Sequence, residues 1–149
     1  VLRGLKTLPV RMRQHVKSAS DLAHRLVAAK GVRVVHYPGL ASHPDHALCQ
    51  AQMAGGGRMI SLEREGGVDE SRRFLSALRI FTLAESLGGV ESLAEHPAIM
   101  THAPIPAEVR RAVGITDSLV RLSVGLEDVE DLWNDLNRGL AAMRGAPQV

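Results

Sequence analysis

The 149-residue chain has 45% hydrophobic and 23% charged residues, which is typical of one globular domain. No apolar run approaches the roughly 18 residues that span a bilayer, and the single cysteine, Cys49, cannot form an internal disulfide, so we expect a cytoplasmic protein without a membrane segment. The charge is uneven, because residues 1–58 carry nine basic and two acidic residues whereas residues 59–149 carry nine basic and fourteen acidic ones.

The basic N-terminal part does not indicate a nucleic-acid site. Its basic residues surround a helix that also has an apolar stripe, and the whole chain has only four aromatic residues for stacking on bases. We expect this charged surface to meet another part of the same protein. The chain begins with Val1 inside a predicted helix, so we also expect it to be a fragment of a longer protein.

The first predicted element is a long helix over residues 2–29. Pro9 lies inside it and should kink or restart the helix near Thr7 or Leu8, and Gly31 should end it. Apolar residues recur along it at spacings of three and four, which places them on one helix face: Leu5, Leu8, Met12, Val16, Ala19, Leu22, Leu26 and Val27.

Shorter elements follow. Pro44 and Asp45 are typical of a helix start, and the three glycines at residues 55–57 should end that helix and lead into a strand. The predicted elements are a strand at 32–35, a helix at 46–53, a strand at 59–63, a helix at 69–79 and a strand at 81–84.

Residues 97–106 contain three prolines and should be rich in loops. Pro106 should start a helix over 107–113, and residues 118–124 should form a strand with Arg121 on the face opposite Val120 and Leu122. Four acidic residues after Gly125 predict the first turns of a last helix, which runs to about Met143. Short strands that alternate with helices predict an α+β fold, or an α/β fold with one helix-covered sheet, in a single domain over residues 1–149.

No common catalytic or metal motif is present. His43, His46 and Cys49 recur every third residue, but His43 precedes Pro44, outside the helix, and no fourth ligand is near, so we interpret Cys49 as a buried core residue and predict no metal site. The glycines at 55–57 lack the residues of a phosphate loop or a dinucleotide fingerprint and should form a turn. There is also no Gly-x-Ser-x-Gly elbow for a serine hydrolase.

Two polar residues are candidates for a binding site. Arg121 could offer its guanidinium to a carboxylate, or could be an ordinary solvent-facing arginine on a strand. Ser86, before Gly88 and Gly89, could donate its hydroxyl to a ligand or could simply end a strand. The stretch ESLGGVESL at residues 85–93 repeats Glu-Ser-Leu, and we expect only its first copy to face a ligand, whereas Glu91 and Ser92 should serve local hydrogen bonding and solvation.

Four motifs together resemble one family. They are RGLKTLPVRM at 3–12, YPGLASHPDH at 37–46, ESLGGVESLAEHPAIMTHA at 85–103 and GITDSLVRLSVGLEDVEDL at 114–132. The chain is identified from them as a member of the pyridoxal phosphate-dependent enzymes of cysteine and methionine metabolism, such as cystathionine γ-synthase, cystathionine γ-lyase and methionine γ-lyase. The resemblance implies the small C-terminal domain of a fold-type I enzyme, a mostly antiparallel sheet covered by helices, with a helix at residues 1–30 that joins it to a large domain.

By this resemblance, three residues bind substrate. The arginine of RLSVG falls on Arg121 and would hold the substrate α-carboxylate; the serine of SLGG falls on Ser86 and would donate a hydrogen bond near it. Glu85 falls on a position at which family members differ. A glutamate there resembles the cystathionine-handling enzymes, whereas methionine γ-lyases tend to have an apolar residue. Glu85 would pair with the distal ammonium of cystathionine.

The resemblance also implies that the chain is incomplete as an enzyme. The family keeps its Schiff-base lysine and most cofactor contacts in the large domain, and the only lysines here, Lys6, Lys17 and Lys30, belong to the first helical region. We therefore expect no catalytic residue in this chain, no pyridoxal phosphate bound to it alone, and no activity. Family members are usually homotetramers.

The sequence leaves alternatives open. The same fold could serve as a stand-alone, non-catalytic interaction module, or the parent could be a methionine γ-lyase. The sequence also does not distinguish synthesis from cleavage of cystathionine, and it does not identify which γ-substituted homoserine is accepted.

Overall fold

The computed structural model describes residues 1–145 as one five-stranded sheet with six helices. The helices are α1 (Leu2–Leu5), α2 (Leu8–Val27), α3 (His46–Gln52), α4 (Val68–Ala77), α5 (Ala107–Ala112) and α6 (Val129–Met143). The strands are β1 (Val32–His36), β2 (Met59–Arg64), β3 (Thr82–Leu83), β4 (Leu93–Glu95) and β5 (Leu119–Ser123). None of the helices in this described range is long and apolar enough to cross a membrane.

The predicted N-terminal helix is interrupted where Pro9 requires it. α1 ends at Leu5 and Thr7 is the N-cap of α2, so Pro9 lies in the first turn of α2, where its missing N–H is not needed. The burial of the apolar stripe is uneven, because Leu22 and Leu26 are fully buried whereas Leu5 is exposed. Only the second half of α2 therefore packs into the core.

The sheet has the strand order β1-β2-β5-β4-β3. β1, β2, β5 and β4 pair antiparallel, and β3 pairs parallel with β4, so the sheet is mixed and the fold is α+β. In the registers, Arg121 of β5 lies opposite Ser61 of β2 on one side and opposite Glu95 of β4 on the other. The predicted antiparallel character is thus confirmed for four of the five strands.

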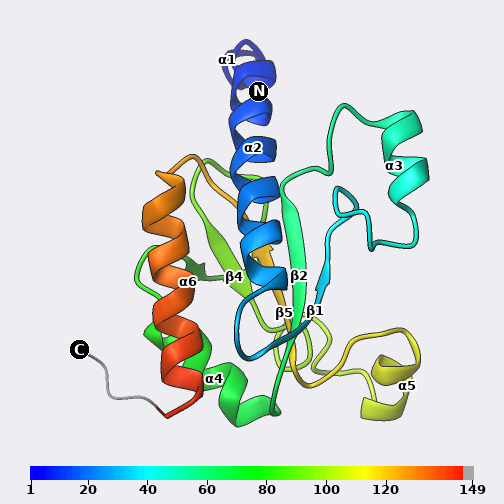
Figure 1. Ribbon diagram of the computed structural model, residues 1–149, viewed down its shortest axis with the longest axis vertical. Coiled ribbons are helices and arrows are strands. Elements are labelled where there is room, and N and C mark those ends of the chain that lie inside the picture. The colour runs from blue at the N-terminus through cyan, green and yellow to red at the C-terminus, as the bar shows by residue number, and fades with distance from the viewer. Residues whose placement is uncertain (146–149) are drawn as a thin grey trace.

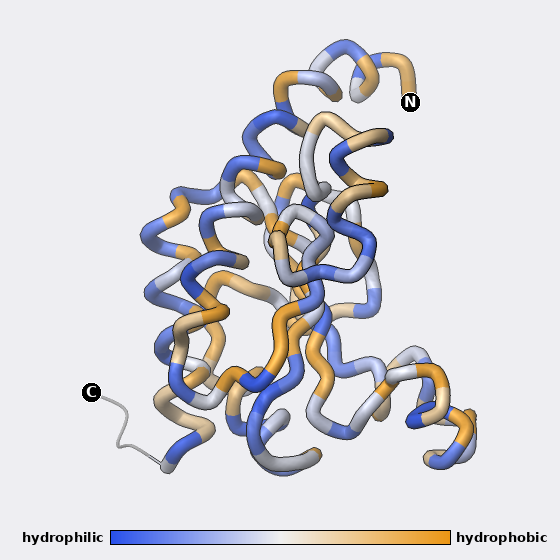
Figure 2. The backbone as a smooth tube through the Cα atoms, turned by 45° about the vertical axis from the view of Figure 1, so that its right-hand side comes forward, coloured by the Kyte–Doolittle hydropathy of each residue, from blue (hydrophilic) through white to orange (hydrophobic). Residues whose placement is uncertain are grey.

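Three of the helices, α2, α4 and α6, form a layer on one face of this sheet (Figure 1). α2 and α6 lie beside each other against it, and α4 packs on α6, whereas α3 and α5 lie on the side of the molecule away from α6 (Figure 1). Helices α2 and α6 alternate between hydrophilic and hydrophobic residues along their length, as expected of helices that bury one face (Figure 2). The core between these layers contains Leu22, Leu26, Ile60, Leu62, Phe74, Val120, Leu122, Leu132 and Leu136, all fully buried.

The middle of the chain differs from the sequence-based predictions at three places. Residues 93–95 form β4, a strand that the sequence does not predict, because three residues are too few to show an alternating pattern. Ser92, expected to be solvated, is fully buried. The predicted strand at 81–84 is shortened to two residues, and Phe81 before it is buried in the core.

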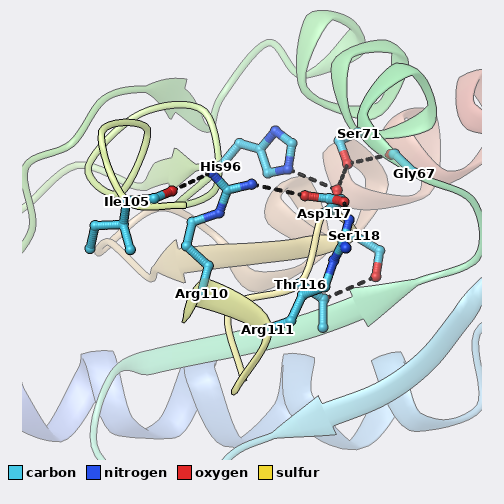
Figure 3. A network of polar contacts seen from close by, with 9 residues as sticks. All are labelled: Gly67, Ser71, His96, Ile105, Arg110, Arg111, Thr116, Asp117 and Ser118. Atoms are coloured by element: carbon cyan, nitrogen blue, oxygen red, sulfur yellow. Dashed lines mark hydrogen bonds and ion pairs between the residues drawn. The ribbon is translucent and has the colours of Figure 1, made fainter. Parts of the chain in front are cut away.

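A polar network anchors the turn that enters β5 (Figure 3). Arg110 and Arg111 donate to the Asp117 carboxylate at 3.1 and 2.8 Å, and the arginines hold the pKa of Asp117 below its ordinary value, with Arg111 contributing most. The Asp117 carbonyl accepts from His96 Nε2 at 3.0 Å and from the Ser71 hydroxyl at 3.1 Å. Residues from α4, α5 and the end of β4 thus fix the start of the strand that carries Arg121.

Candidate functional site

Arg121 lies in the middle of β5. Its neighbours Val120 and Leu122 are fully buried in the core, so the guanidinium points to the opposite face of the sheet. There it forms an ion pair with Glu95 of β4, and its Nη2 donates to the main-chain carbonyl of Glu85 at 2.9 Å. The Arg121 side chain is 25% exposed, which places it between a buried residue and an ordinary solvent-facing strand arginine.

The Glu95 carboxylate is a residue of this site that the sequence did not predict. Its side chain is 1% exposed, the Thr101 hydroxyl donates to one carboxylate oxygen, and Arg121 lies against the other. A buried carboxylate needs such partners, because an unpaired buried charge is strongly unfavourable. The only signal in the sequence is an acidic residue that follows Leu93 and Ala94 two positions ahead of a proline. This signal becomes informative only once β4 is known to pair with β5.

The guanidinium of Arg121 retains donors for a ligand. Both of its contacts with residues in the described part of the chain leave from Nη2. Nη1 and Nε therefore have no hydrogen-bond partner among residues 1–145 and can donate to a further carboxylate.

Glu85 and Ser86 follow β3, with a bend of the chain at Glu85, and both are exposed. The contact with Arg121 involves the carbonyl of Glu85, and the side chains of Glu85 and Ser86 make no hydrogen bond with the described residues. Gly88 has a φ of +85°, a conformation that disfavours any residue with a Cβ, and it turns the chain back toward β4. The structure thus brings the predicted Arg121 and Glu85 together, with Ser86 next in the chain.

The second Glu-Ser copy has a different role from the first. Ser92 donates from its hydroxyl and its main-chain N–H to the Glu127 carboxylate, both at 2.8 Å, and its hydroxyl oxygen accepts the N–H of Gly125 at 2.7 Å. A Cβ on Gly125 would lie 2.6 Å from Ser92 N, so only glycine allows this close approach. Ser92 therefore joins the glycine-containing segment to the residues that follow β5.

The histidines and the cysteine of the rejected metal motif have separate partners. His46 Nδ1 lies 2.9 Å from the carbonyl of Pro38, and His43 Nδ1 accepts the N–H of Asp45 at 3.1 Å. Cys49 is buried, as predicted. Within residues 1–145, no group of three or more His, Cys, Asp or Glu side chains is placed to hold a metal ion.

The glycines at 55–57 form the predicted turn between α3 and β2. A Cβ on Gly56 would lie 2.6 Å from both Gly39 N and the ring of Tyr37, so this turn packs too closely for a side chain. Its role is packing against the Tyr37 segment.

Comparison with known proteins gives one consistent family. A sequence model described as "Cys/Met metabolism PLP-dependent enzyme" matches residues 1–141. The chain is 52% identical over 139 residues to the cystathionine gamma-lyase of Dictyostelium discoideum, and 49% identical over 142 residues to the L-methionine gamma-lyase of Pseudomonas putida. These matches cover 93% and 95% of this chain and 36% of each relative, so the chain spans about a third of the curated relatives' length.

A solved structure extends this similarity to three dimensions. The cystathionine gamma synthase of Xanthomonas oryzae pv. oryzae, crystallised in complex with cystathionine, superposes with a TM-score of 0.92 at 52% sequence identity. The match covers 98% of this chain and 38% of that one.

Proposed function

Because this chain belongs to the Cys/Met metabolism family of pyridoxal phosphate-dependent enzymes, we propose that it is the substrate-side, C-terminal domain of an enzyme that acts on cystathionine or an O-acyl homoserine. The reaction would be γ-elimination or γ-replacement. The observation that carries the proposal is the hydrogen bond from Arg121 to the main-chain carbonyl of Glu85 at 2.9 Å, across 36 residues of sequence. This contact brings the cationic Arg121 close to the segment that carries the exposed Glu85 carboxylate and Ser86 hydroxyl.

Each of the three residues has a role that its chemistry supports. Arg121 binds the substrate α-carboxylate through the donors that its protein contacts leave free, a charge-assisted contact. The exposed Ser86 hydroxyl donates a hydrogen bond beside it. The Glu85 carboxylate pairs with the distal ammonium of cystathionine, a group that methionine lacks.

The described residues do not fit a resident pyridoxal phosphate. The family attaches this cofactor to a lysine, and Lys6, Lys17 and Lys30 are all exposed residues of the segment around α1 and α2. We therefore place cofactor binding in the remainder of the longer protein. Alone, this chain would bind and orient part of a substrate without converting it.

The N-terminal helices provide a surface for that remainder. Leu2, Leu5 and Val10 are at least half exposed, and a groove of about 540 Å³ lies between α2 and the residues after α3, lined by Met12, Val16 and Met53 among others. Exposed apolar residues beside an apolar groove are typical of an interface. We propose that residues 1–30 join this domain to the cofactor-binding domain there.

The test uses the full-length protein that contains this chain. Loaded with pyridoxal phosphate, it should absorb visible light in a band that borohydride abolishes, and it should release a 2-oxo acid from cystathionine. Assays with O-acyl homoserine and methionine then assign the reaction, and turnover of methionine alone would identify a methionine γ-lyase instead.

The 149-residue chain alone is the matched control and should show no turnover. Turnover by the chain alone would contradict the proposal that this chain only binds substrate while the rest of the protein holds the cofactor. A folded, colourless full-length protein that converts none of the three substrates would favour the alternative, a non-catalytic interaction module with the same fold.

A further inference from the structure

Arg58 is a buried arginine that no part of the proposed substrate site uses. It lies at the entry to β2 with only 7% of its surface exposed, and burial lowers the pKa of its guanidinium. No carboxylate among the described residues forms an ion pair with it; Glu91 and Glu127 favour its charge only through longer-range attraction. A buried cation without a direct counterion requires other strong partners.

One of these partners is the buried His15 of α2. Arg58 Nη1 lies 3.0 Å from His15 Nε2, and His15 Nδ1 lies 3.1 Å from the carbonyl of Gly125. A guanidinium only donates, so Nε2 must accept and Nδ1 must carry the proton, which assigns a neutral imidazole. Burial and the neighbouring Arg58 lower the pKa of His15, in agreement with this neutral form. His15 therefore orients the guanidinium from the helix side.

The other partners belong to the glycine turn beside the proposed site. Arg58 Nη1 also donates to the carbonyl of Gly89 at 2.6 Å, and Nη2 donates to the Ser123 hydroxyl at 3.1 Å. The same hydroxyl oxygen accepts the N–H of Gly88 at 3.3 Å. Arg58 thus holds one glycine of the turn directly and the other through Ser123.

The segment that carries the proposed substrate contacts is therefore held by an arginine at each end. Arg121 donates to the carbonyl of Glu85, and Arg58 donates to the carbonyl of Gly89. Between these points the side chains of Glu85, Ser86 and the half-exposed Leu87 have no hydrogen bond with the described residues. Without the Arg58 contact, the segment would keep the Arg121 contact and the weaker bond of the Gly88 N–H to the Ser123 hydroxyl. Beyond the turn it would keep the main-chain hydrogen bond between Val90 and Leu126 and the Ser92 contacts.

We infer that Arg58, oriented by His15, is a positioning residue of the substrate site: it fixes the Gly88-Gly89 turn and thereby the placement of Glu85 and Ser86. This inference rests on the proposed function. Arg58 acts on the reaction only through that segment.

The experiment compares Arg58→Gln and Arg58→Lys with the unmutated full-length protein. Glutamine has a single side-chain amide in place of the guanidinium and cannot reach His15, Gly89 and Ser123 together, so amide hydrogen exchange over residues 85–91 should become about 10-fold faster or more. KM for cystathionine should rise by a similar factor of about 10 with a smaller change in kcat, because binding is affected and the chemistry is not. Lysine keeps the charge and can donate to Gly89 or Ser123, and should restore part of both effects.

Arg72→Gln is the matched control, since Arg72 is an exposed arginine on α4 whose ion pair with Asp69 is also exposed. It should change neither exchange over residues 85–91 nor KM. If Arg58→Gln does not fold, Ser123→Ala removes the hydroxyl that links Arg58 to Gly88. This variant should show faster exchange and a higher KM, each by a smaller factor.

Unchanged exchange over residues 85–91 in the Arg58 variants would overturn the inference. Faster exchange with an unchanged KM in an active enzyme would overturn it as well, because Arg58 would then only support the fold. An unmutated full-length protein that converts none of the substrates refutes the proposed function instead, and the exchange measurement still tests whether Arg58 holds the turn.

Discussion

Replacement of Arg121 should have two separate effects, because the same side chain is the proposed carboxylate ligand and the partner of the buried Glu95. Glu95 is 1% exposed, and in Arg121→Met it would keep only the Thr101 hydroxyl as a hydrogen-bond partner. Removal of one member of a buried ion pair typically costs 3–5 kcal/mol. Since the Arg121 side chain is 25% exposed, we expect the lower end, about 3 kcal/mol of unfolding free energy.

A second substitution separates the two effects. In Arg121→Met/Glu95→Gln no charge is left buried, and the glutamine can still accept from Thr101, so most of the stability should return, to within about 1 kcal/mol. Substrate binding should not return. Loss of a charge-assisted contact of about 1.5–3 kcal/mol corresponds to a rise in KM of roughly 10- to 150-fold in both variants.

The assays are urea unfolding of the 149-residue chain and KM for cystathionine with the full-length protein, whose cofactor absorbance should stay intact. Arg33→Met is the stability control, because Arg33 also pairs with a carboxylate on the neighbouring strand, Glu63, but is 57% exposed, and its loss should cost about 1 kcal/mol or less. Equal stability of the single and the double variant would refute the role of Glu95. An unchanged KM would remove Arg121 from the site.

Three further predictions follow from other contacts. Asp135→Asn should lower the unfolding free energy by roughly 2–4 kcal/mol in urea unfolding, because the fully buried carboxylate accepts the main-chain N–H groups of Arg79, Ile80 and Phe81 at 2.8–3.0 Å and an amide has one acceptor oxygen. The pKa of Asp117 is lowered in the folded state, so its contribution to stability is present above its ordinary pKa near 4 and is lost as the pH falls through the lowered value. In Asp117→Asn, the free energy of unfolding should therefore fall less steeply on the acid side of its pH profile, the acid limb. Glu85→Ala should raise KM for cystathionine by about 10-fold or more and leave KM for methionine nearly unchanged, since only cystathionine has a distal ammonium.

Each of these has an outcome that contradicts it. For Asp135, the exposed Asp69→Asn is the control, and an equally small effect of both would show that the three N–H contacts contribute little. An unaltered acid limb in Asp117→Asn would assign the pH dependence to other groups. Equal changes of both KM values in Glu85→Ala would remove Glu85 as the residue that distinguishes the substrates.

Elements with a strong local pattern were predicted well from the sequence. The break at Pro9, the turn at residues 55–57, the strands around Ile60 and Arg121 and the last helix all follow from proline, glycine and apolar spacing, and each is present. β2 shows the limit of the same pattern. Its alternation places Arg64 on the buried face with Ile60 and Leu62, yet nothing in the sequence shows that a guanidinium can be accommodated there.

The structure shows how Arg64 is accommodated. Its guanidinium lies 5.1 Å from the centre of the Phe74 ring, donates to the carbonyl of Ser118 at 3.1 Å and contacts the Ser71 hydroxyl, while burial lowers its pKa to about 10. Ser71 and Phe74 belong to α4, the next element along the chain, and Ser118 lies just before β5, 54 residues away. Burial of a charge depends on such partners from other elements, which the alternation within one strand does not reveal.

The same reasoning explains which part of the candidate site was not predicted. Arg121 and Glu85 were named from motifs, but Glu95 and Arg58 become meaningful only through the pairing of β4 with β5 and through the return of the glycine turn to β2. Both position the named residues: Glu95 lies across from the Arg121 guanidinium, and Arg58 holds the turn after Ser86. A search by sequence for substrate-binding residues finds groups that would touch the ligand, whereas the groups that orient them are buried, lie on other elements and require the fold to be known.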